Sequence, residues 1–235
     1  MKPRTSPVII AVAALAFSST AWALPGVDIG LGVFGLAGAS IIDQVSGGSE
    51  ADKAYPGFAG TRTGIGFTLE ARVFGMLGIE AGYIKSSDKG SGDIKFGAYD
   101  VSASLGQTAT HIPVVLKFVL PIPVFKPFAL VGIDYVSPDT CEATLKTGGV
   151  TIPTTCYNAS YSMWTAGIGA EIALPIPGLD IRIPFSVRGS KHRDFGDTMA
   201  DRGTLTVGSP SSSSANLRSE WRYDVYGTVG AAIFF

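Results

Sequence analysis

The chain has 235 residues, a formal net charge of −1, 46% hydrophobic residues and only 16% charged ones. This balance leaves no basic surface for nucleic acid, so we expect no nucleic-acid partner. Beyond the N-terminus no segment offers eighteen uninterrupted apolar residues, which excludes a helical membrane protein. A chain this apolar can instead alternate in β-strands, with every second residue facing lipid.

The N-terminus has the pattern of a secretory signal. Two basic residues precede an apolar run over residues 8–17, which is too short to span a bilayer as a helix. Ala21 and Ala23 then supply the small-x-small pattern that a signal peptidase cleaves. We therefore predict a cleaved signal peptide over residues 1–23 and a single barrel domain over residues 24–235. An uncleaved membrane anchor is the alternative.

Eight later segments alternate between apolar residues and polar or small ones with a period of two. They cover residues 27–33, 65–73, 77–83, 112–120, 129–135, 164–172, 179–187 and 221–235. Such alternation is typical of strands that lie between lipid and a polar interior. The predicted fold class is therefore all-β, an eight-stranded antiparallel transmembrane β-barrel.

The connections between these segments alternate in length. Short ones fall near residues 75–76, 121–126 and 175–178, and long polar ones cover residues 39–62, 87–107, 137–157 and 191–219. Bacterial barrels have short turns on the periplasmic side and long loops outside. The pattern therefore predicts both termini in the periplasm and four loops on the outer side.

One stretch, residues 93–107, does not fit this pattern cleanly. Its apolar residues Tyr99, Ala103 and Leu105 lie on odd positions, whereas the outward residues of the following strand are even. A β-bulge at Gly106 would reconcile the two by extending that strand beyond the membrane. A small hairpin in the outer loop and a barrel of ten strands are the other interpretations.

A soluble β-sandwich or lipocalin-like barrel would show the same alternation, with the apolar face inward. The signal peptide, the unequal connections and the C-terminus favour the membrane. The last strand contains Gly230 and Ile233 and ends on Phe235. This ending resembles the C-terminal signal by which the barrel-assembly machinery recognises outer-membrane proteins. The resemblance makes that machinery an expected partner, with Gly230, Ile233 and Phe235 as the assembly signal.

The polar face of the eight segments carries ten charged residues, five acidic and five basic. They are Glu70, Arg72, Glu80, Lys117, Asp134, Glu171, Arg182, Arg188, Arg222 and Asp224. The interior of an eight-stranded barrel is only wide enough for side chains to fill. We therefore predict a salt-bridged network that closes the lumen. A narrow or gated ion path is the alternative.

The two cysteines, Cys141 and Cys156, lie close together in a polar stretch. In an exported protein such a pair predicts a disulfide, which here would join the two sides of the third outer loop. Two free thiols are the alternative. Two cysteines without nearby histidines make a poor zinc site, so we expect no metal site and no cofactor.

The two histidines, His111 and His192, are the candidates for catalysis. His192 lies near the outer end of a predicted strand, where Ser190 or Ser162 together with Asp194 could complete a Ser–His–acid arrangement. The sequence matches no motif of the lipid A deacylases, the palmitoyltransferases or the omptin proteases. We therefore expect no catalytic residues and no enzyme. The charged run around His192 is more typical of a solvated strand end that contacts lipopolysaccharide phosphates.

Four aromatic residues gather toward the outer ends of the predicted strands. They are Tyr161, Trp164, Trp221 and Tyr223. Aromatic girdles mark the membrane–water interfaces of transmembrane barrels, and we predict that these residues form such a girdle.

Residues 110–118 and 126–132 form two linked motifs. The first has a His-x-Pro followed by apolar residues and Lys117, and the second is Lys-Pro-Phe with Gly132 four residues later. This run resembles a hairpin common in outer membrane protein β-barrel domains. The chain is similar to the OmpA-like, OmpW-like and porin-family barrels of Gram-negative bacteria. The resemblance implies the cell outer membrane, a monomer, and contact with outer membrane lipids and lipopolysaccharide.

The resemblance leaves two kinds of function open. One is a structural or surface-interaction protein with a closed lumen, whose loop partner the sequence does not reveal. The other is a small pore, or an OmpW-like conduit that releases hydrophobic solutes sideways into the bilayer. A lateral opening needs a strand that is interrupted in mid-barrel, and Pro113 and Pro184 are the candidates.

Overall fold

The structure is a computed structural model that describes residues 26–42, 58–96, 99–157, 159–194, 216–218 and 220–235. Its strands are β1 (Val27–Ile42), β2 (Phe58–Val73), β3 (Leu77–Phe96), β4 (Tyr99–Val119), β5 (Phe125–Thr147), β6 (Val150–Tyr157), β7 (Tyr161–Ile176), β8 (Leu179–His192), β9 (Asn216–Arg218) and β10 (Tyr223–Phe234). Within these residues no helix is long and apolar enough to cross a membrane. The predicted signal peptide, with Ala21 and Ala23, lies outside the described residues.

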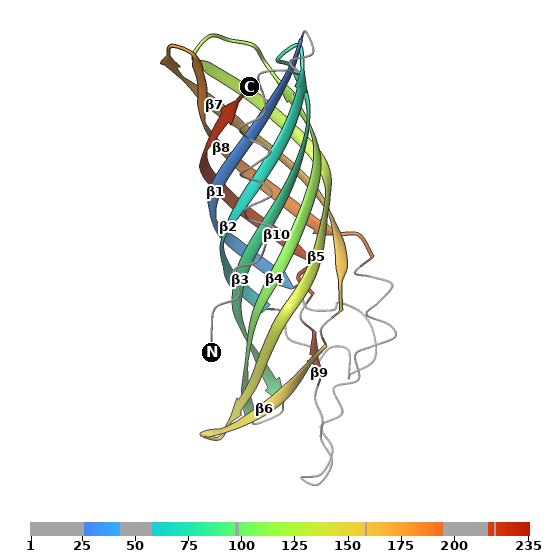
Figure 1. The fold of residues 1–235 in the computed structure, drawn as a ribbon. Coiled ribbons are helices and arrows are strands. Elements are labelled where there is room, and N and C mark those ends of the chain that lie inside the picture. The colour runs from blue at the N-terminus through green and yellow to red at the C-terminus, as the bar shows by residue number, and fades with distance from the viewer. Residues whose placement is uncertain (1–25, 43–57, 97–98, 158, 195–215, 219) are drawn as a thin grey trace, which may run out of the picture.

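Eight of the strands close into an antiparallel barrel (Figure 1). The order around the wall is β1, β2, β3, β4, β5, β7, β8 and β10, and the pairing of β10 with β1 completes the ring. β6 pairs with the C-terminal part of β5, from Ala143 to Thr147, and β9 runs parallel to β6. The prediction of an eight-stranded barrel is confirmed. The ten-stranded barrel is wrong, because the two additional strands extend the sheet outside the ring.

The short turns lie at one end of the barrel, near the C-terminus (Figure 1). Gly75 in the β2–β3 turn and Gly178 in the β7–β8 turn have φ angles of +66° and +80°. Glycine adopts this left-handed conformation at little steric cost, which explains its place in both turns. By the rule for bacterial barrels this is the periplasmic end. The opposite end is called the outer end below.

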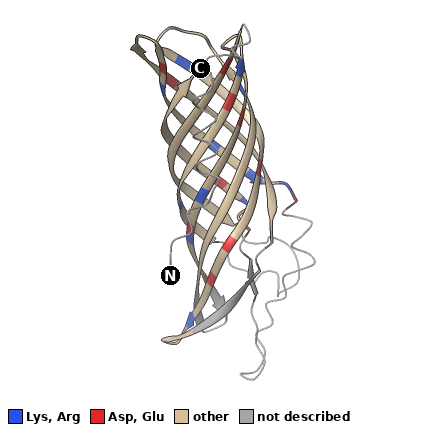
Figure 2. Cartoon of the chain, viewed as in Figure 1, with Lys and Arg blue, Asp and Glu red and all other residues tan. Residues whose placement is uncertain are grey.

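The two faces of the wall separate by residue parity. On β2, Ile65 and Leu69 are 68% and 52% exposed, whereas Glu70 and Arg72 are 5% and 0% exposed. The apolar face therefore points outward and the charged face inward, which is the polarity of a membrane barrel and the reverse of a soluble one. Figure 2 shows charged residues at several heights along the strands rather than only at their ends.

The strands continue well beyond the segments that the sequence predicted. β2 begins at Phe58, β3 runs to Phe96 and β5 runs to Thr147, all through stretches expected to be loops. These predicted loop boundaries are wrong because the strands continue outside the membrane, where their outward residues no longer face lipid. There the outer face of the wall is polar, so the apolar alternation that identified the strands disappears.

The outer end of the barrel encloses an apolar cluster. Ala103 and Leu105 of β4 pack there with Ile42, Phe58 and Trp221, and each of the five is at most 1% exposed. The outward neighbours of Ala103 on β4 are Ser102 and Ser104. A wall with polar residues outside and apolar residues inside has the polarity of a soluble barrel. The chain therefore reverses the polarity of its wall between the membrane and the outer end.

This reversal resolves the misfit in residues 93–107. β4 is one continuous strand whose odd positions face inward from Ala103 to its end. The predicted bulge at Gly106 is wrong, because the register shift lies on β5, at Asp139. No change of parity is needed on β4, since Ala103 and Leu105 are interior residues of the apolar cluster.

The predicted aromatic girdle is half right. Trp164 faces outward with 53% exposure, and Tyr223 is partly exposed. Tyr161 and Trp221 are instead buried inside the barrel. They lie at the outer end, where the interior is apolar, so large aromatic side chains pack inward there.

Candidate functional site in the barrel lumen

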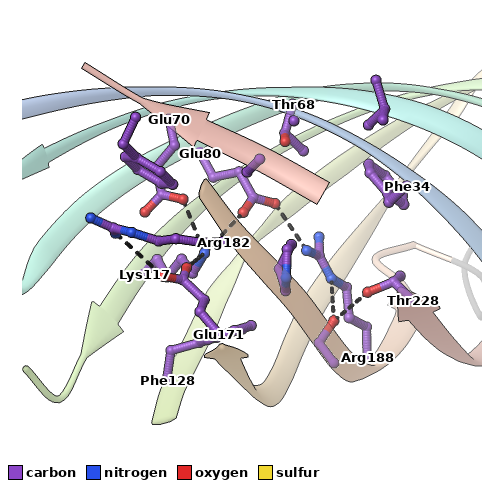
Figure 3. Close-up of a pocket in the computed structure, with 16 residues that line it drawn as sticks. Phe34, Thr68, Glu70, Glu80, Lys117, Phe128, Glu171, Arg182, Arg188 and Thr228 are labelled. Atoms are coloured by element: carbon purple, nitrogen blue, oxygen red, sulfur yellow. Dashed lines mark hydrogen bonds and ion pairs between the residues drawn. The ribbon is translucent and has the colours of Figure 1, made fainter. Parts of the chain in front are cut away.

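A continuous network of ion pairs crosses the periplasmic half of the lumen, with Lys117 of β4 at its centre (Figure 3). The Lys117 Nζ lies 2.6 Å from Glu171 Oε1, 3.0 Å from Glu70 Oε2 and 3.5 Å from Glu80 Oε2. The three glutamates come from β7, β2 and β3. One ammonium group therefore connects four strands across the interior.

Two arginines join this network near the periplasmic end. The Arg72 Nη2 lies 2.5 Å from Glu70 Oε1 and 2.7 Å from Glu171 Oε1. Arg182 lies 3.4 Å from Glu171 and also pairs with Asp180 at the rim. Glu171 therefore accepts from three cations, which fills the hydrogen-bonding capacity of a buried carboxylate.

A third arginine extends the network toward the outer end. The Arg188 Nη2 lies 2.9 Å from Glu80 Oε1, and its Nε donates to Ser186 Oγ at 3.1 Å. Ser186 is itself 2.7 Å from Thr228 Oγ1. With Lys117 this arginine completes a set of four cations and four carboxylates whose formal charges cancel. A buried charge is costly unless it is paired, and here each has a partner.

Each of the four cations also lies beside an aromatic ring. Arg182 Cζ is 3.8 Å and Arg72 Cζ is 4.8 Å from the centre of the Phe234 ring, and Lys117 Nζ is 4.3 Å from that of Phe128. For the fourth cation, Arg188, the Cζ lies 6.0 Å from the centre of the Phe34 ring on β1. Rings at these distances attract the cations. β1, β5 and β10 supply the rings, whereas the other five barrel strands supply the charges.

Glycines make room for these rings. Phe34 pairs in register with Gly66 of β2 and Gly230 of β10. A Cβ at Gly66 would come within 2.6 Å of the Phe34 ring, and one at Gly230 within 2.7 Å of the Phe34 Cβ. Phe128 lies in the same way against Gly169, where a Cβ would come within 2.6 Å of the ring. Gly230, expected in the assembly signal, therefore has a packing role in the lumen.

Little free space remains in this layer. The cavity among Glu80, Lys117, Phe128 and Pro184 has a volume of about 30 Å³. A water molecule occupies roughly 10–15 Å³ of such a cavity, so there is room for about two water molecules. Side chains of the network and the rings of Phe34, Phe128 and Phe234 line this cavity.

A second buried group lies nearer the outer end, around Arg62 of β2. Its Nε lies 2.6 Å from Asp88 Oδ1, and its Nη1 lies 2.5 Å from Asp224 Oδ2. Ser40 also donates to Asp88, at 3.4 Å. All four side chains are at most 2% exposed. Arg62 therefore bridges β3 and β10 across the lumen, as Lys117 does in the layer below.

His111 belongs to this outer layer and has a serine and an aspartate as partners. Its Nδ1 lies 2.8 Å from Asp134 Oδ2, and its Nε2 lies 3.0 Å from Ser86 Oγ. This is the connectivity of a Ser–His–acid relay. The Ser86 side chain is only 3% exposed, however, and its Oγ also donates to Asp88 at 3.0 Å. The three residues hold the layer together and present no accessible nucleophile.

The other histidine, His192, has different neighbours from those considered in the sequence. Its Nε2 lies 3.2 Å from Glu220 Oε2, and its Nδ1 accepts from the backbone N–H of Asp194 at 3.1 Å. Ser190 lies 2.8 Å from Thr165 Oγ1. The acid that pairs with the His192 ring at 3.2 Å is therefore Glu220 rather than the Asp194 considered in the sequence.

The structure places nine of the ten predicted interior charges inside the lumen, Arg222 being the exception. Arg222 is half-buried just before β10, with its guanidinium 5.1 Å from the centre of the Tyr223 ring. Sequence reasoning missed Arg62, Asp88 and the role of His111. Arg62 and Asp88 have the same even parity as the interior residues of β2 and β3. Continuing that parity outward would have located them.

The cysteine pair lies beside the outer apolar cluster. Cys141 of β5 is partly buried there, and Cys156 belongs to β6, although its side chain is not among those described. The register of β5 and β6 pairs Ala143 with Thr154, and two more residues along it Cys141 would face Cys156. Directly opposed residues of antiparallel strands have Cα separations that suit a disulfide. The disulfide itself stays a prediction.

The described residues include no group of three or more His, Cys, Asp or Glu side chains that could hold a metal ion. The charge clusters of the lumen each combine carboxylates with Arg, Lys or His partners. Their chemistry is therefore that of ion pairing and hydrogen bonding.

The barrel wall is interrupted at the two prolines noted in the sequence. The pairing of β3 with β4 skips Pro113, and that of β8 with β10 skips Pro184, because proline has no N–H to donate. A groove of about 620 Å³ also lies on the lipid-facing wall over β5, β7 and β8. It reaches Phe128 and Ser186, which line the lumen cavity as well, beside Gly169. The wall between lumen and lipid is therefore thin at this point.

An apolar outward wall around a charged interior, with unequal connections at its two ends, defines a transmembrane β-barrel of the bacterial type. The chain belongs to the outer membrane protein beta-barrel domain family, whose model matches residues 5–209. The resemblance stated from the sequence is confirmed. Membership implies the outer membrane of a Gram-negative bacterium.

Several solved structures are similar over most of their length at low identity. Neisserial surface protein A is 10% identical, over 89% of this chain and 96% of that one, with a TM-score of 0.39. OprG from Pseudomonas aeruginosa is 12% identical, over 89% and 96%, with a TM-score of 0.42. Ail of Yersinia pestis is 11% identical, over 88% and 99%, with a TM-score of 0.38. No curated protein sequence matches the chain.

Proposed function

We propose that this protein is an outer-membrane barrel with a closed lumen, and that it acts as a structural or surface-interaction protein rather than as an enzyme or an open pore. The observation that carries the proposal is the network around Lys117. Four cations and four carboxylates from five strands cross the lumen, with about 30 Å³ left free. An ion could pass only by separating buried pairs, and an unpaired buried charge is costly.

The outer end of the barrel supports the second half of this proposal. β3, β4 and β5 continue past the membrane with polar side chains outward, and hydroxyl groups pair across the strands, as in Ser104–Thr144 and Thr108–Thr140. The apolar cluster behind them holds this region in a defined shape. Such a rigid polar surface is suited to an extracellular partner.

Conductance in planar bilayers tests the closed lumen. We expect folded wild-type protein to show little or no steady conductance, because the ion pairs leave no continuous water path. Arg72→Ala should open a small cation-preferring leak, since it leaves Glu70 and Glu171 with fewer cations. Lys85→Ala, which removes an outward-facing cation, should remain silent. Stable open levels in the wild type would contradict the proposal.

A conduit that releases hydrophobic solutes sideways is the second candidate function. The thin wall beside Gly169 favours it, because Phe128 and Ser186 line both the lumen cavity and the lipid-facing groove. The missing pairing at Pro184 lies on the same side of the barrel. If the wall opens there, proteoliposomes should take up a hydrophobic fluorescent solute, and Phe128→Ala should accelerate uptake. No difference between proteoliposomes and empty liposomes would exclude this route.

The processing and assembly of the chain are also part of the proposal. We expect signal peptidase to cleave after Ala23, so that the N-terminal sequence of protein from outer membranes begins at Leu24. We expect the barrel-assembly machinery to insert the barrel as a monomer among outer membrane lipids and lipopolysaccharide. The outward-facing Phe235 at the end of β10, 48% exposed, is available for recognition by that machinery.

A further inference from the structure

Two cations that are two residues apart in sequence lie on the outward face of the wall at its outer end. Lys191 is the penultimate residue of β8, and Arg193 follows β8. Both are exposed, and among the described residues neither forms an ion pair with a carboxylate. Lys191 Nζ lies 5.9 Å from the centre of the Tyr223 ring, and Arg193 Cζ lies 5.1 Å from that of Trp164. Asp194 is the nearest acid in sequence.

The opposite side of the barrel has an outward cation that is paired with a carboxylate. Lys85 of β3 lies beyond Tyr83, above the apolar band, and its Nζ is 2.7 Å from Asp139 Oδ2. The hydrogen bond from Lys85 holds the pKa of the Asp139 carboxyl below its ordinary value. The charge at Lys85 is therefore locally neutralised, whereas the charges of Lys191 and Arg193 are available to a ligand.

A hollow lies directly beside these cations, on the side toward the membrane centre. Lys191 pairs in register with Trp164 of β7 and with Tyr223 of β10, so a cation stands between two aromatic residues. The next row toward the membrane consists of Ala166, Gly189 and Val225. Because Ala166 and Gly189 have little or no side chain, the wall is hollowed there beside Val225, with a volume of about 390 Å³. The lining of the hollow is mainly apolar.

The height of this site matches the headgroups of the outer leaflet. Lys191 lies twelve residues along β8 from Leu179, which begins the strand at the periplasmic turn. At about 3.3 Å per residue and a strand tilt near 40°, this corresponds to roughly 30 Å along the membrane normal. The apolar band of such barrels is about 25 Å tall. The cations therefore lie just above the acyl chains, and the hollow lies just within them.

We propose that this surface binds a phosphorylated, acylated glycolipid of the outer leaflet, with its phosphate on Lys191 and Arg193 and an acyl chain in the hollow between Trp164 and Tyr223. Guanidinium and ammonium groups are the side chains that bind phosphate. A soluble anion would use the cations but leave the apolar hollow empty, whereas an anionic glycolipid satisfies both. The proposal is independent of whether the lumen conducts.

Native mass spectrometry of the full protein in a neutral detergent tests this site, with diphosphorylated lipid A as the probe. We expect one lipid A molecule to bind with preference over its dephosphorylated form and over phosphatidylglycerol. Lys191→Ala with Arg193→Ala should weaken binding at least about tenfold, because basic side chains at a membrane surface each contribute to the binding of anionic lipid. Ala166→Phe, which fills the hollow and keeps both charges, should also weaken it.

A matched control removes two outward charges from the other side of the barrel, as Lys85→Ala with Lys89→Ala. We expect this variant to bind lipid A like the wild type. An equal loss in both double variants would overturn the proposal in favour of general charge attraction. Equal binding of dephosphorylated lipid would overturn the role of the phosphate, and equal binding of phosphatidylglycerol would overturn the glycolipid. Normal heat-modifiable mobility of each variant shows that a loss of binding does not come from misfolding.

Discussion

Arg72 shows what single residues contribute to the interior. Its guanidinium is fully buried and pairs with Glu70 and Glu171, which come from two strands on different sides of the lumen. Removing such a group costs more than the ion pair itself is worth, because its partners stay buried with uncompensated charge.

We therefore predict that Arg72→Ala lowers the free energy of unfolding by about 3–5 kcal/mol. Urea unfolding of the reconstituted barrel, followed by the loss of heat-modifiable mobility, measures this change. Lys85→Ala is the control, since its exposed pair with Asp139 is worth at most about 1 kcal/mol. Equal stability of the two variants would show that the interior network contributes no more than a surface pair.

Neighbouring residues on one strand have opposite environments, which Leu69 and Glu70 illustrate. Leu69 is 52% exposed on the outward face and Glu70 is 5% exposed in the lumen. We predict that Leu69→Arg costs about 2–4 kcal/mol, because the charge would face the hydrocarbon of the membrane. Glu70→Leu should also destabilise the barrel, since it unpairs Arg72 and Lys117. If both variants unfold at the wild-type urea concentration, the assignment of faces is inverted.

At the scale of elements, β5 and β6 form a hairpin that leaves the barrel at its outer end. If Cys141 and Cys156 are bonded, the loop of about fifteen residues that they enclose contributes roughly 3 kcal/mol in the chain-entropy model. We predict one intramolecular disulfide. Alkylation of non-reduced protein from an oxidising periplasm should modify neither cysteine. The variant with both cysteines replaced by serine should still insert, because the barrel pairing does not include β6. Two alkylated thiols in the wild type would refute the bond.

β10 is the element that closes the ring. Its last residue, Phe234, and the following residue, Phe235, have different roles. Phe234 faces inward and lies against Arg72 and Arg182, whereas Phe235 is outward and 48% exposed. We predict that Phe235→Ser leaves the protein misassembled in the periplasm, which the yield in the outer-membrane fraction measures. Phe125→Ser is a matched control, because Phe125 is a similarly exposed aromatic residue at the start of β5. Normal yield of Phe235→Ser would exclude its role in recognition.

At the scale of the whole molecule, the barrel consists of two regions with opposite polarity. The membrane region has charges inside and apolar residues outside, and the outer region has Leu105 and its neighbours inside and polar residues outside. We predict that Leu105→Ala, which removes a buried side chain, destabilises the outer region by about 2–5 kcal/mol while the membrane region stays folded. Hydrogen exchange should become faster in the outer half of β4 and stay slow around Lys117. Uniform acceleration along β4 would indicate that the regions do not respond separately.

Much of this architecture is determined by the sequence alone. The alternation of residues such as Leu69 and Glu70 defines eight strands, their faces and the charged interior, because a strand between lipid and lumen must change polarity at every residue. The short turns and nine of the ten interior charges follow from the same rule. Where the wall leaves the membrane the rule no longer applies. There the extent of the strands, the inward packing of Trp221 and the places of Arg62 and Asp88 were missed.

The tertiary structure decided which of these residues meet. Periodicity assigns Lys117 and Glu171 to the same interior, but they are far apart in sequence, and only closure of the ring brings the ammonium group within 2.6 Å of the carboxylate. The same holds for the rings of Phe34 and Phe128, which fill the lumen because glycines on neighbouring strands leave space for them. Alternation is a local property of one strand and is visible in sequence. Pairing across a lumen depends on the register and the curvature of all eight strands together.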